Sequence, residues 1–278
     1  MTNRNTSNVL LAAEQISVHY GERQVVHHLS LGIRQGEITA LVGPNGSGKS
    51  TLLKALARLL RPDSGSVLLD GVMIARLPTR EVARRLAILP QGPSLPPGIT
   101  VAELVEQGRY PHAGPLRMLR AQDHAAIDEA LALTGMDNFA QRPLDKLSGG
   151  ERQRAWIALA LAQATPTLLL DEPTTFLDIG HQLEILDLVR RLNRERGMTI
   201  VLVLHDLNQA ARYANRMIAL QDGRICADGT PAQVLTPALL EAVFGVQAHV
   251  IADPQTGAPV CLPFACLRKQ YKCSPGLK

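Results

Sequence analysis

The sequence has few aromatic residues and no long apolar run. Only 3% of its 278 residues are Phe, Trp or Tyr, so we expect a core built mainly from Leu, Ile, Val and Ala. No stretch approaches the roughly 20 apolar residues that a transmembrane helix needs, and the polar residues 1–5 do not resemble the start of a signal peptide. These absences argue against a membrane-spanning chain and predict a protein that remains in the cytoplasm.

Cysteine is scarce as well. Cys226 stands apart, and Cys261, Cys266 and Cys273 are spaced C-x4-C-x6-C. Zinc ligands usually come as closer pairs, separated by two to four residues. We therefore assign these thiols no metal and no catalytic role.

No strong excess of charge points to nucleic acid. The formal net charge is +4, charged residues make up 19% of the chain, and 46% is hydrophobic, a globular composition. The arginines are spread among expected helices instead of forming one block, which favours solvated helix faces. We expect no nucleic-acid partner.

The strongest motif is a phosphate-binding loop of the form G-x-x-x-x-G-K-[ST], which lies between an apolar strand (residues 37–42) and a helix-forming run (residues 52–57). Its glycines let successive amide groups point at one anion, and the helix N-terminus adds partial positive charge. We expect Lys49 to reach the β- and γ-phosphates and the Ser50 hydroxyl to bind Mg²⁺. The expected nucleotide-binding residues are Gly43, Pro44, Asn45, Gly46, Ser47, Gly48, Lys49, Ser50 and Thr51.

A second glycine motif, L-S-G-G-E-R-Q, runs from Leu147 to Gln153 and opens a predicted helix over residues 151–164. A helix that follows Ser148 and two glycines offers an anion site at its N-terminus. Taken alone, the motif also fits an ordinary loop with a helix cap. Its place just ahead of a strand that ends in two acids favours nucleotide chemistry.

Those two acids, Asp171 and Glu172, follow the apolar run of residues 168–170. In a phosphate-loop fold the first acid after such a strand completes the Mg²⁺ site. Glu172 would then lie beside the γ-phosphate, where a carboxylate can polarise the attacking water. His205 follows another buried strand (residues 198–204), and ligands of parallel sheets bind just beyond such carboxyl ends.

Several stretches predict the organisation of the chain. Residues 9–33 have the pattern of short strands separated by turns, and Thr79 is a candidate cap for a helix over residues 79–85. A block of helices over about residues 100–165 begins with a capping box at Thr100 and interrupts the strands. We expect one domain over residues 1–240 with a short extension over residues 241–278, whose last eleven residues are basic and expected to fray.

The order of these motifs resembles that of the nucleotide-binding subunits of ABC transporters. The resemblance spans residues 9–240 and rests on the phosphate loop, L-S-G-G-E-R-Q, L-L-L-D-E-P, Leu177-Asp178 and His205. It implies an α/β fold: a P-loop NTPase core of ABC ATPase type with an N-terminal antiparallel β subdomain and an inserted α-helical subdomain. It also implies an ATPase with ATP and Mg²⁺ as cofactors.

The resemblance implies roles for single residues around the nucleotide. Tyr20 is similar to the aromatic residue that stacks on adenine. Gln91 is similar to the glutamine that contacts Mg²⁺ and relays the nucleotide state to the membrane partner. Asp171 resembles the Mg²⁺-coordinating acid, Glu172 the general base and His205 the switch histidine.

Other roles concern a second subunit. Ser148, Gly149 and Gly150 are similar to the signature that closes on the γ-phosphate of ATP held by the partner, and Asp178 to the aspartate exchanged across the dimer. The resemblance therefore implies a homodimer of ATPase subunits. It further implies two membrane permease subunits, an indirect role for a substrate-binding protein, and a peripheral position on the cytoplasmic face of the inner membrane. The loop around Arg109 and Tyr110 is a candidate permease contact by the same analogy.

A finer resemblance concerns the cargo. The stretches Q-G-R-Y-P-H (residues 107–112), T-T-F-L-D-I-G-H-Q (residues 174–182) and H-D-L-N-Q-A (residues 205–210) are similar to the ATPases of bacterial ferric-siderophore importers. Cobalamin and haem importers share parts of them. None of these residues needs to touch the cargo, so cobalamin and haem remain the alternatives.

Two other classes fit the sequence less well. Soluble ABC ATPases of translation or DNA repair usually carry two cassettes or a long coiled-coil insertion, and this sequence has neither. A P-loop kinase or GTPase would not carry the L-S-G-G motif together with the Asp171-Glu172 pair.

Overall fold

The computed structural model describes residues 8–92, 98–113 and 118–267. In chain order the strands are β1 (Val9–Tyr20), β2 (Arg23–Arg34), β3 (Ile38–Val42), β4 (Ser64–Leu69), β5 (Val72–Met73), β6 (Leu86–Leu89), β7 (Thr167–Asp171), β8 (Thr199–Val203), β9 (Arg216–Gln221), β10 (Arg224–Gly229), β11 (Val246–Ala252) and β12 (Pro259–Cys266). The helices are α1 (Lys49–Leu56), α2 (Thr79–Arg85), α3 (Val101–Glu106), α4 (Ala121–Thr134), α5 (Gly149–Ala162), α6 (Ile179–Arg196), α7 (Leu207–Tyr213), α8 (Pro231–Val234) and α9 (Pro237–Leu239).

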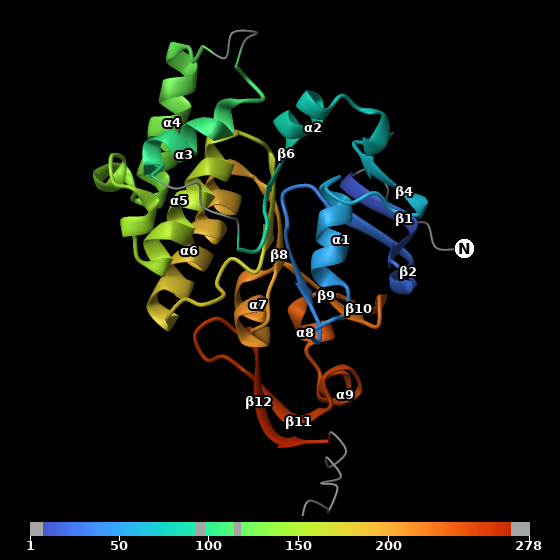
Figure 1. Cartoon of the computed structure of the whole chain (residues 1–278). Helices are drawn as coiled ribbons and strands as arrows, with labels where there is room; N and C mark the ends of the chain where they lie inside the picture. The colour runs from blue at the N-terminus through green and yellow to red at the C-terminus, as the bar shows by residue number, and fades with distance from the viewer. Residues whose placement is uncertain (1–7, 93–97, 114–117, 268–278) are drawn as a thin grey trace, which may run out of the picture.

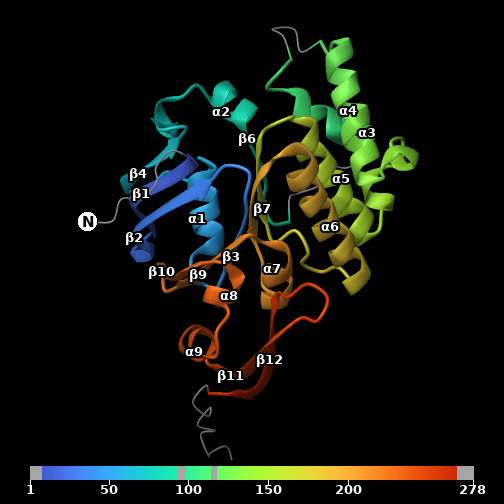
Figure 2. The same ribbon diagram turned by 180° about the vertical axis from the view of Figure 1, so that it is seen from behind.

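Two sheets with α1 between them form the centre of the molecule. The larger sheet has the strand order β10-β9-β3-β8-β7-β6, and the smaller antiparallel sheet the order β2-β1-β4-β5. Figure 1 shows the smaller sheet on one side of the central strands and α3 to α6 on the other, and Figure 2 shows the same layers from behind. The predicted α/β class, with a β subdomain and a helical subdomain, is confirmed.

The central strands are apolar because both faces of the sheet are covered. Every residue of β3, β7 and β8 is buried, and these strands pair in parallel. One face packs against side chains of α5, α6 and α7, and the other against α1 and the smaller sheet. Parallel strands need such cover, and their parallel pairing brings the carboxyl ends of β3, β7 and β8 to one edge of the sheet.

The N-terminal sheet corrects one prediction. The sequence predicts short strands over residues 9–33, but β1 and β2 are two strands of 12 residues each, joined at Gly21. Their pairing contains several register shifts. Each irregularity breaks the alternation of apolar and polar residues, so a continuous strand looks like several short ones.

Helix ends follow the expected capping signals in most cases. Thr100 accepts a hydrogen bond from the Glu103 amide, and the Glu103 side chain returns one to Thr100, a complete capping box. Gly135 ends α4 with φ of 64°, as predicted for a C-terminal glycine. Thr79 is different: it is the first residue of α2 and makes no capping bond, because Pro78 occupies the cap position.

The C-terminal part forms a hairpin fixed to α7. A π-helical turn over Leu240–Phe244 follows α9, and β11 and β12 pair antiparallel. The side-chain amide of Asn208 holds the hairpin: its Oδ1 accepts from the Cys261 amide at 2.7 Å, and its Nδ2 donates to the Cys261 carbonyl at 3.2 Å. Burial raises the pKa of the Cys261 thiol, whereas Cys226 and Cys266 are exposed. Cys273 and the basic tail lie outside the described residues.

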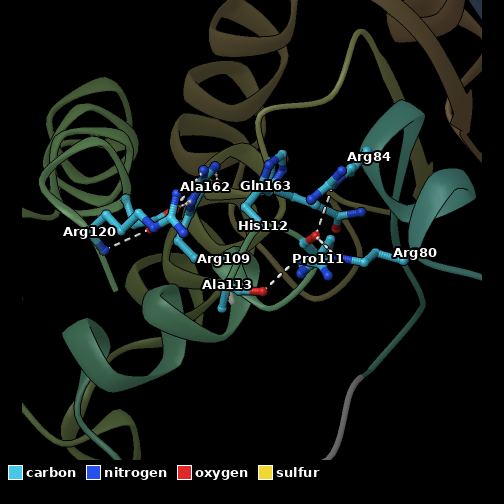
Figure 3. A network of polar contacts seen from close by, with 10 residues as sticks. Arg80, Arg84, Arg109, Pro111, His112, Ala113, Arg120, Ala162 and Gln163 are labelled. Atoms are coloured by element: carbon cyan, nitrogen blue, oxygen red, sulfur yellow. Dashed lines mark hydrogen bonds and ion pairs between the residues drawn. The ribbon is translucent and has the colours of Figure 1, made fainter. Parts of the chain in front are cut away.

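A buried polar network joins the helical subdomain to the core (Figure 3). The Arg109 guanidinium, only 6% exposed, pairs with Asp123 at 2.9 Å and donates to the Ala162 carbonyl at 2.7 Å. From α2, Arg80 and Arg84 both donate to the Pro111 carbonyl. The charge of Arg109 is therefore used inside the fold, and a permease contact of the loop around Arg109 and Tyr110 stays a prediction.

Breaking this buried pair is expected to destabilise the helical subdomain. We expect Asp123→Ala to cost about 3 kcal/mol or more in free energy of unfolding, because Arg109 is left as a buried unpaired charge. Urea unfolding followed by the fluorescence of the single tryptophan, Trp156, which packs in this subdomain, measures the loss. The matched control is Glu129→Ala in the exposed pair with Arg196, where less than about 1 kcal/mol is expected. Equal losses in both variants would contradict the structural role of the buried pair.

Candidate functional site: a phosphate-binding cavity at the sheet edge

The phosphate loop connects β3 to α1, as its sequence predicts. Gly43 has φ of 150°, and a Cβ built on it would lie 2.1 Å from the Leu220 carbonyl oxygen. Gly48, with φ of 96°, occupies the cap position of α1. No other residue type fits Gly43 without moving the backbone, so the loop is shaped by contact with β9 as well as by its own glycines.

Lys49 is the first residue of α1 and its side chain turns back along the loop. Its Nζ donates to the carbonyl oxygens of Gly43 and Pro44, each at 2.9 Å, and the residue is only 5% exposed. Burial lowers the pKa of Lys49, while the negative charges of Glu172 and Asp171 oppose this shift. The lysine is thereby held as a fixed cation at the loop.

Asp171 lies at the end of β7 and faces the loop. Its Oδ1 accepts a hydrogen bond from Ser50 Oγ at 2.8 Å, and the residue is 2% exposed. Burial raises the pKa of Asp171 above its usual value, and the Ser50 hydrogen bond and the nearby lysines offset part of that shift. A carboxylate and a hydroxyl are thus paired at the start of α1.

Glu172 follows in a backbone conformation that non-glycine residues rarely adopt, with φ of 53°. Its carboxylate accepts from Thr175 Oγ1 at 3.1 Å and from Gln91 Nε2, and it contacts His205 Nε2. Strained backbone of this kind persists where the surroundings hold it, and it clusters at functional sites. Three groups from three segments therefore fix the position of one carboxylate.

These side chains surround a cavity of about 380 Å³. The structure brings together the phosphate loop, Gln91, Glu172 and His205, which the sequence had placed in one site from widely separated motifs. The lining residues are Val25, Asn45, Gly46, Gly48, Lys49, Ser50, Thr51, Gln91, Glu172 and His205.

Several predicted residues do not line this cavity. Gly43, Pro44, Ser47 and Asp171 lie next to lining residues, whereas Tyr20, Ser148, Gly149, Gly150 and Asp178 come from other segments. Tyr20 ends β1 and is 50% exposed. Ser148 caps α5 through a capping box with Glu151, and Asp178 caps α6. Gly149 and Gly150 begin α5 beside the Asp178 segment, since a Cβ on Gly150 would lie 2.6 Å from the ring of His181. The signature and Asp178 therefore form a second group of their own.

Two contributors were missed by the sequence analysis. Val25 lines the cavity from β2, and nothing in a strand of alternating apolar residues marks it. Thr175 holds Glu172. Thr175 follows Glu172 by three residues, a spacing at which a hydroxyl can donate to the carboxylate. The sequence therefore offered a signal for this contact.

The sheet, the phosphate loop and the cavity define a P-loop nucleoside triphosphatase. The family described as "ABC transporter" matches residues 26–175. The chain belongs to this family, as an ATP-binding subunit that hydrolyses ATP.

Similar proteins cover nearly the whole chain. Iron(3+)-hydroxamate import ATP-binding protein FhuC of Bacillus subtilis is 49% identical over 260 residues, 94% of this chain and 97% of that protein. Ferric enterobactin transport ATP-binding protein FepC of Escherichia coli is 48% identical over 91% of this chain and 93% of its own length. A cobalamin import ATP-binding protein, BtuD of Halobacterium salinarum, is 42% identical over 89% of this chain and 62% of its own length.

Solved structures agree with the fold. A chain from a metal-chelate type ABC transporter in an inward-facing conformation matches with a TM-score of 0.80 and 28% identity, over 93% of this chain and 98% of that one. The dimeric bacterial ABC transporter cassette MJ0796 matches with a TM-score of 0.71 and 31% identity, over 80% and 98%. Among the described residues, no helix is both long and apolar enough to cross a bilayer.

Removing the buried cation is expected to weaken nucleotide binding. Among the described residues, Lys49 carries the only ammonium group that lines the cavity. We expect Lys49→Ala to lower ATP affinity by about 10- to 100-fold, because charged hydrogen bonds are worth about 1.5–3 kcal/mol. Titration with a fluorescent ATP analogue measures it. Lys146→Ala, at a side chain 72% exposed, is the control. An unchanged affinity in Lys49→Ala would contradict the assigned role.

Proposed function

We propose that this chain is the ATP-hydrolysing subunit of an importer of ferric siderophores. The supporting observation is similarity of 48–49%, over more than nine-tenths of the chain, to two proteins named for hydroxamate and enterobactin transport. In this proposal the protein sits on the cytoplasmic face of the inner membrane. There two copies drive two permease subunits, and a substrate-binding protein delivers the cargo.

Glu172 is the proposed general base. A carboxylate held by Thr175, Gln91 and His205 has little freedom to turn away from a water placed at the γ-phosphate, and pre-positioning of this kind lowers the barrier. Gln91 contacts the base directly, so a displacement of the Gln91 segment by a permease would change the position of Glu172. Lys49 would neutralise the phosphates, His205 would contact the γ-phosphate and Tyr20 would stack on adenine.

The residues at the start of α1 fit a Mg²⁺ ion. Oxygen donors suit this ion, which commonly binds one or two carboxylates together with substrate phosphates. Ser50 Oγ and Asp171 Oδ1 are 2.8 Å apart, and Gln91 lines the cavity together with Ser50; these three residues would hold the ion. When bound, Mg²⁺ neutralises charge on the phosphate oxygens. Burial raises the pKa of Asp171, and a cation beside it would favour the ionised carboxylate.

The second group of residues would act on a partner's nucleotide. Ser148, Gly149, Gly150 and Asp178 do not line the cavity, and the contact of Gly150 with His181 groups them together. In a twofold homodimer each group would meet the other subunit's phosphates. Contacts present only in the closed dimer make ATP favour closure, and hydrolysis would remove that preference.

Cobalamin import is the second candidate, because a cobalamin import ATP-binding protein is 42% identical over 89% of this chain. Its identity of 42% is lower than the 48–49% of the two siderophore proteins, so cobalamin is the runner-up. Haem import follows from the sequence resemblance alone.

Neutralising the base should separate binding from turnover. We expect Glu172→Gln to retain ATP binding, to lose at least about 100-fold in kcat, and to accumulate as an ATP-bound dimer. Steady-state hydrolysis and size-exclusion chromatography with ATP measure both effects. Hydrolysis near the wild-type rate would remove Glu172 from the role of base.

The cargo is tested in cells that lack this protein. We expect uptake of labelled ferric siderophore to be lost, and to return with the wild-type chain but not with Glu172→Gln. Labelled cobalamin is measured in parallel. Loss of cobalamin uptake with unchanged iron uptake would favour the runner-up, and no change in either would refute both cargoes.

A further inference from the structure

The nucleotide cavity has a cationic neighbour that the proposed chemistry does not use. Arg23 begins β2 and is exposed, and its guanidinium forms no hydrogen bond or ion pair with another described residue. Two residues further along the strand, Val25 lines the cavity. Figure 1 shows β1 and β2 beside α1, the helix that follows the phosphate loop. An unpaired guanidinium at this place is available to an anionic ligand.

The Arg23 side chain reaches the phosphate loop. A Cβ built on Gly46 would lie 4.0 Å from Nη2 of Arg23, and Gly46 lines the nucleotide cavity. A later glycine of the loop contacts the same strand, because a Cβ on Gly48 would lie 3.0 Å from the Val25 carbonyl oxygen. The start of β2 is therefore held against the loop, with the guanidinium at the edge of the cavity.

The pairing of β1 with β2 places Arg23 beside the residue that is proposed to stack on adenine. Tyr20 and Arg23 are directly opposite in the antiparallel register, on either side of a turn at Gly21 and Glu22. Side chains of directly opposite residues leave the same face of a sheet, with Cβ atoms about 5 Å apart. Tyr20 is 50% exposed, so both side chains are accessible. The end of this hairpin therefore offers an aromatic ring and a cation side by side.

We propose that Arg23 binds the α-phosphate of the nucleotide, as a binding residue in addition to the phosphate loop. The inference rests on the proposed stacking of Tyr20 on adenine. The ring would fix the nucleoside end of the ligand, and Lys49 and Ser50 would fix the β- and γ-phosphate end. Arg23 stands between these two ends, next to Gly46, where the phosphate joined to the ribose has to pass.

The chemistry of the guanidinium favours a phosphate over the ribose hydroxyls. The group is always ionised, and its planar fork donates two hydrogen bonds to the oxygens of one phosphate. Hydrogen bonds between two charged groups are about twice as strong as those to neutral acceptors.

The contact should act equally on substrate and transition state. The α-phosphate is present in both ATP and ADP, and its charge does not change while the γ-phosphate is transferred to water. An interaction of this kind lowers KM and leaves kcat unchanged. Arg23 is therefore expected to serve binding and not the chemical step, in contrast to Glu172.

The test compares nucleotide binding in Arg23→Ala and in the wild type. We expect the dissociation constants of ADP and of the non-hydrolysable analogue adenylyl imidodiphosphate to rise together by about five- to tenfold, as measured by calorimetry. KM for ATP should rise by the same factor with kcat unchanged. Arg23→Lys should recover part of the affinity, because it keeps the charge and loses the planar fork. The matched control is Arg34→Ala, which removes the same charge from the other end of β2, at a side chain that is 57% exposed.

Salt separates an ionic contact from a structural effect of the substitution. Screening acts within about 3 Å at 1 M salt, so the ratio of the Arg23→Ala and wild-type dissociation constants should shrink there. A ratio that is the same at low and high salt would overturn the proposal. So would unchanged affinities in Arg23→Ala, a loss for the ATP analogue without a loss for ADP, or an equal loss in Arg34→Ala.

Tyr20→Ala tests the premise separately. A lower affinity in Tyr20→Ala with no change in Arg23→Ala would overturn the phosphate contact alone. Unchanged affinity in both variants would overturn the contact together with the proposed stacking on adenine.

Discussion

The site depends on how one buried lysine is balanced by the groups around it. Burial lowers the pKa of Lys49, whereas Glu172 and Asp171 raise it, because a charge is stable away from water only where partners compensate for its lost hydration. The Gly43 and Pro44 carbonyls accept the hydrogen bonds of the ammonium group. The shape of the phosphate loop and the charge balance of the cavity therefore support each other. The parallel sheet makes this possible, since it delivers the loop and both acids to the same edge.

The parts of this arrangement that could be predicted have local signals. The apolar strand, the glycines and Lys49 lie within about a dozen consecutive residues, and the Thr100 capping box lies within four. Asp171, Glu172 and His205 follow buried strands, and the rule that parallel strands end at one edge was enough to bring them together. The long-range geometry was not available in this way. Gly43 lies against Leu220, which is far away in the sequence. This contact is a better explanation than the motif for the requirement of glycine at position 43.

Other features were missed because their cause lies between distant segments or in irregular backbone. Arg109 looks like a surface residue until Asp123, on another helix, is placed beside it. The register shifts between β1 and β2 hide two long strands behind a broken apolar pattern. Backbone conformation is the third case: Glu172 and Phe176 both have positive φ, and neither residue type signals it. Both strained positions lie on the loop that follows β7, where they aim one side chain into the cavity and leave the other in solvent.

The glycines of the signature acquire a structural reason from this loop. Gly150 has no room for a side chain, because the His181 ring occupies the place where a Cβ would lie, and His181 is itself fixed by Asp178. The contact locks the start of α5 to the start of α6. Two segments that are about thirty residues apart in the sequence are thus in direct contact, so the signature and Asp178 lie close together. A side chain at Gly150 would therefore displace the His181 ring and, with it, the contact between His181 and Asp178.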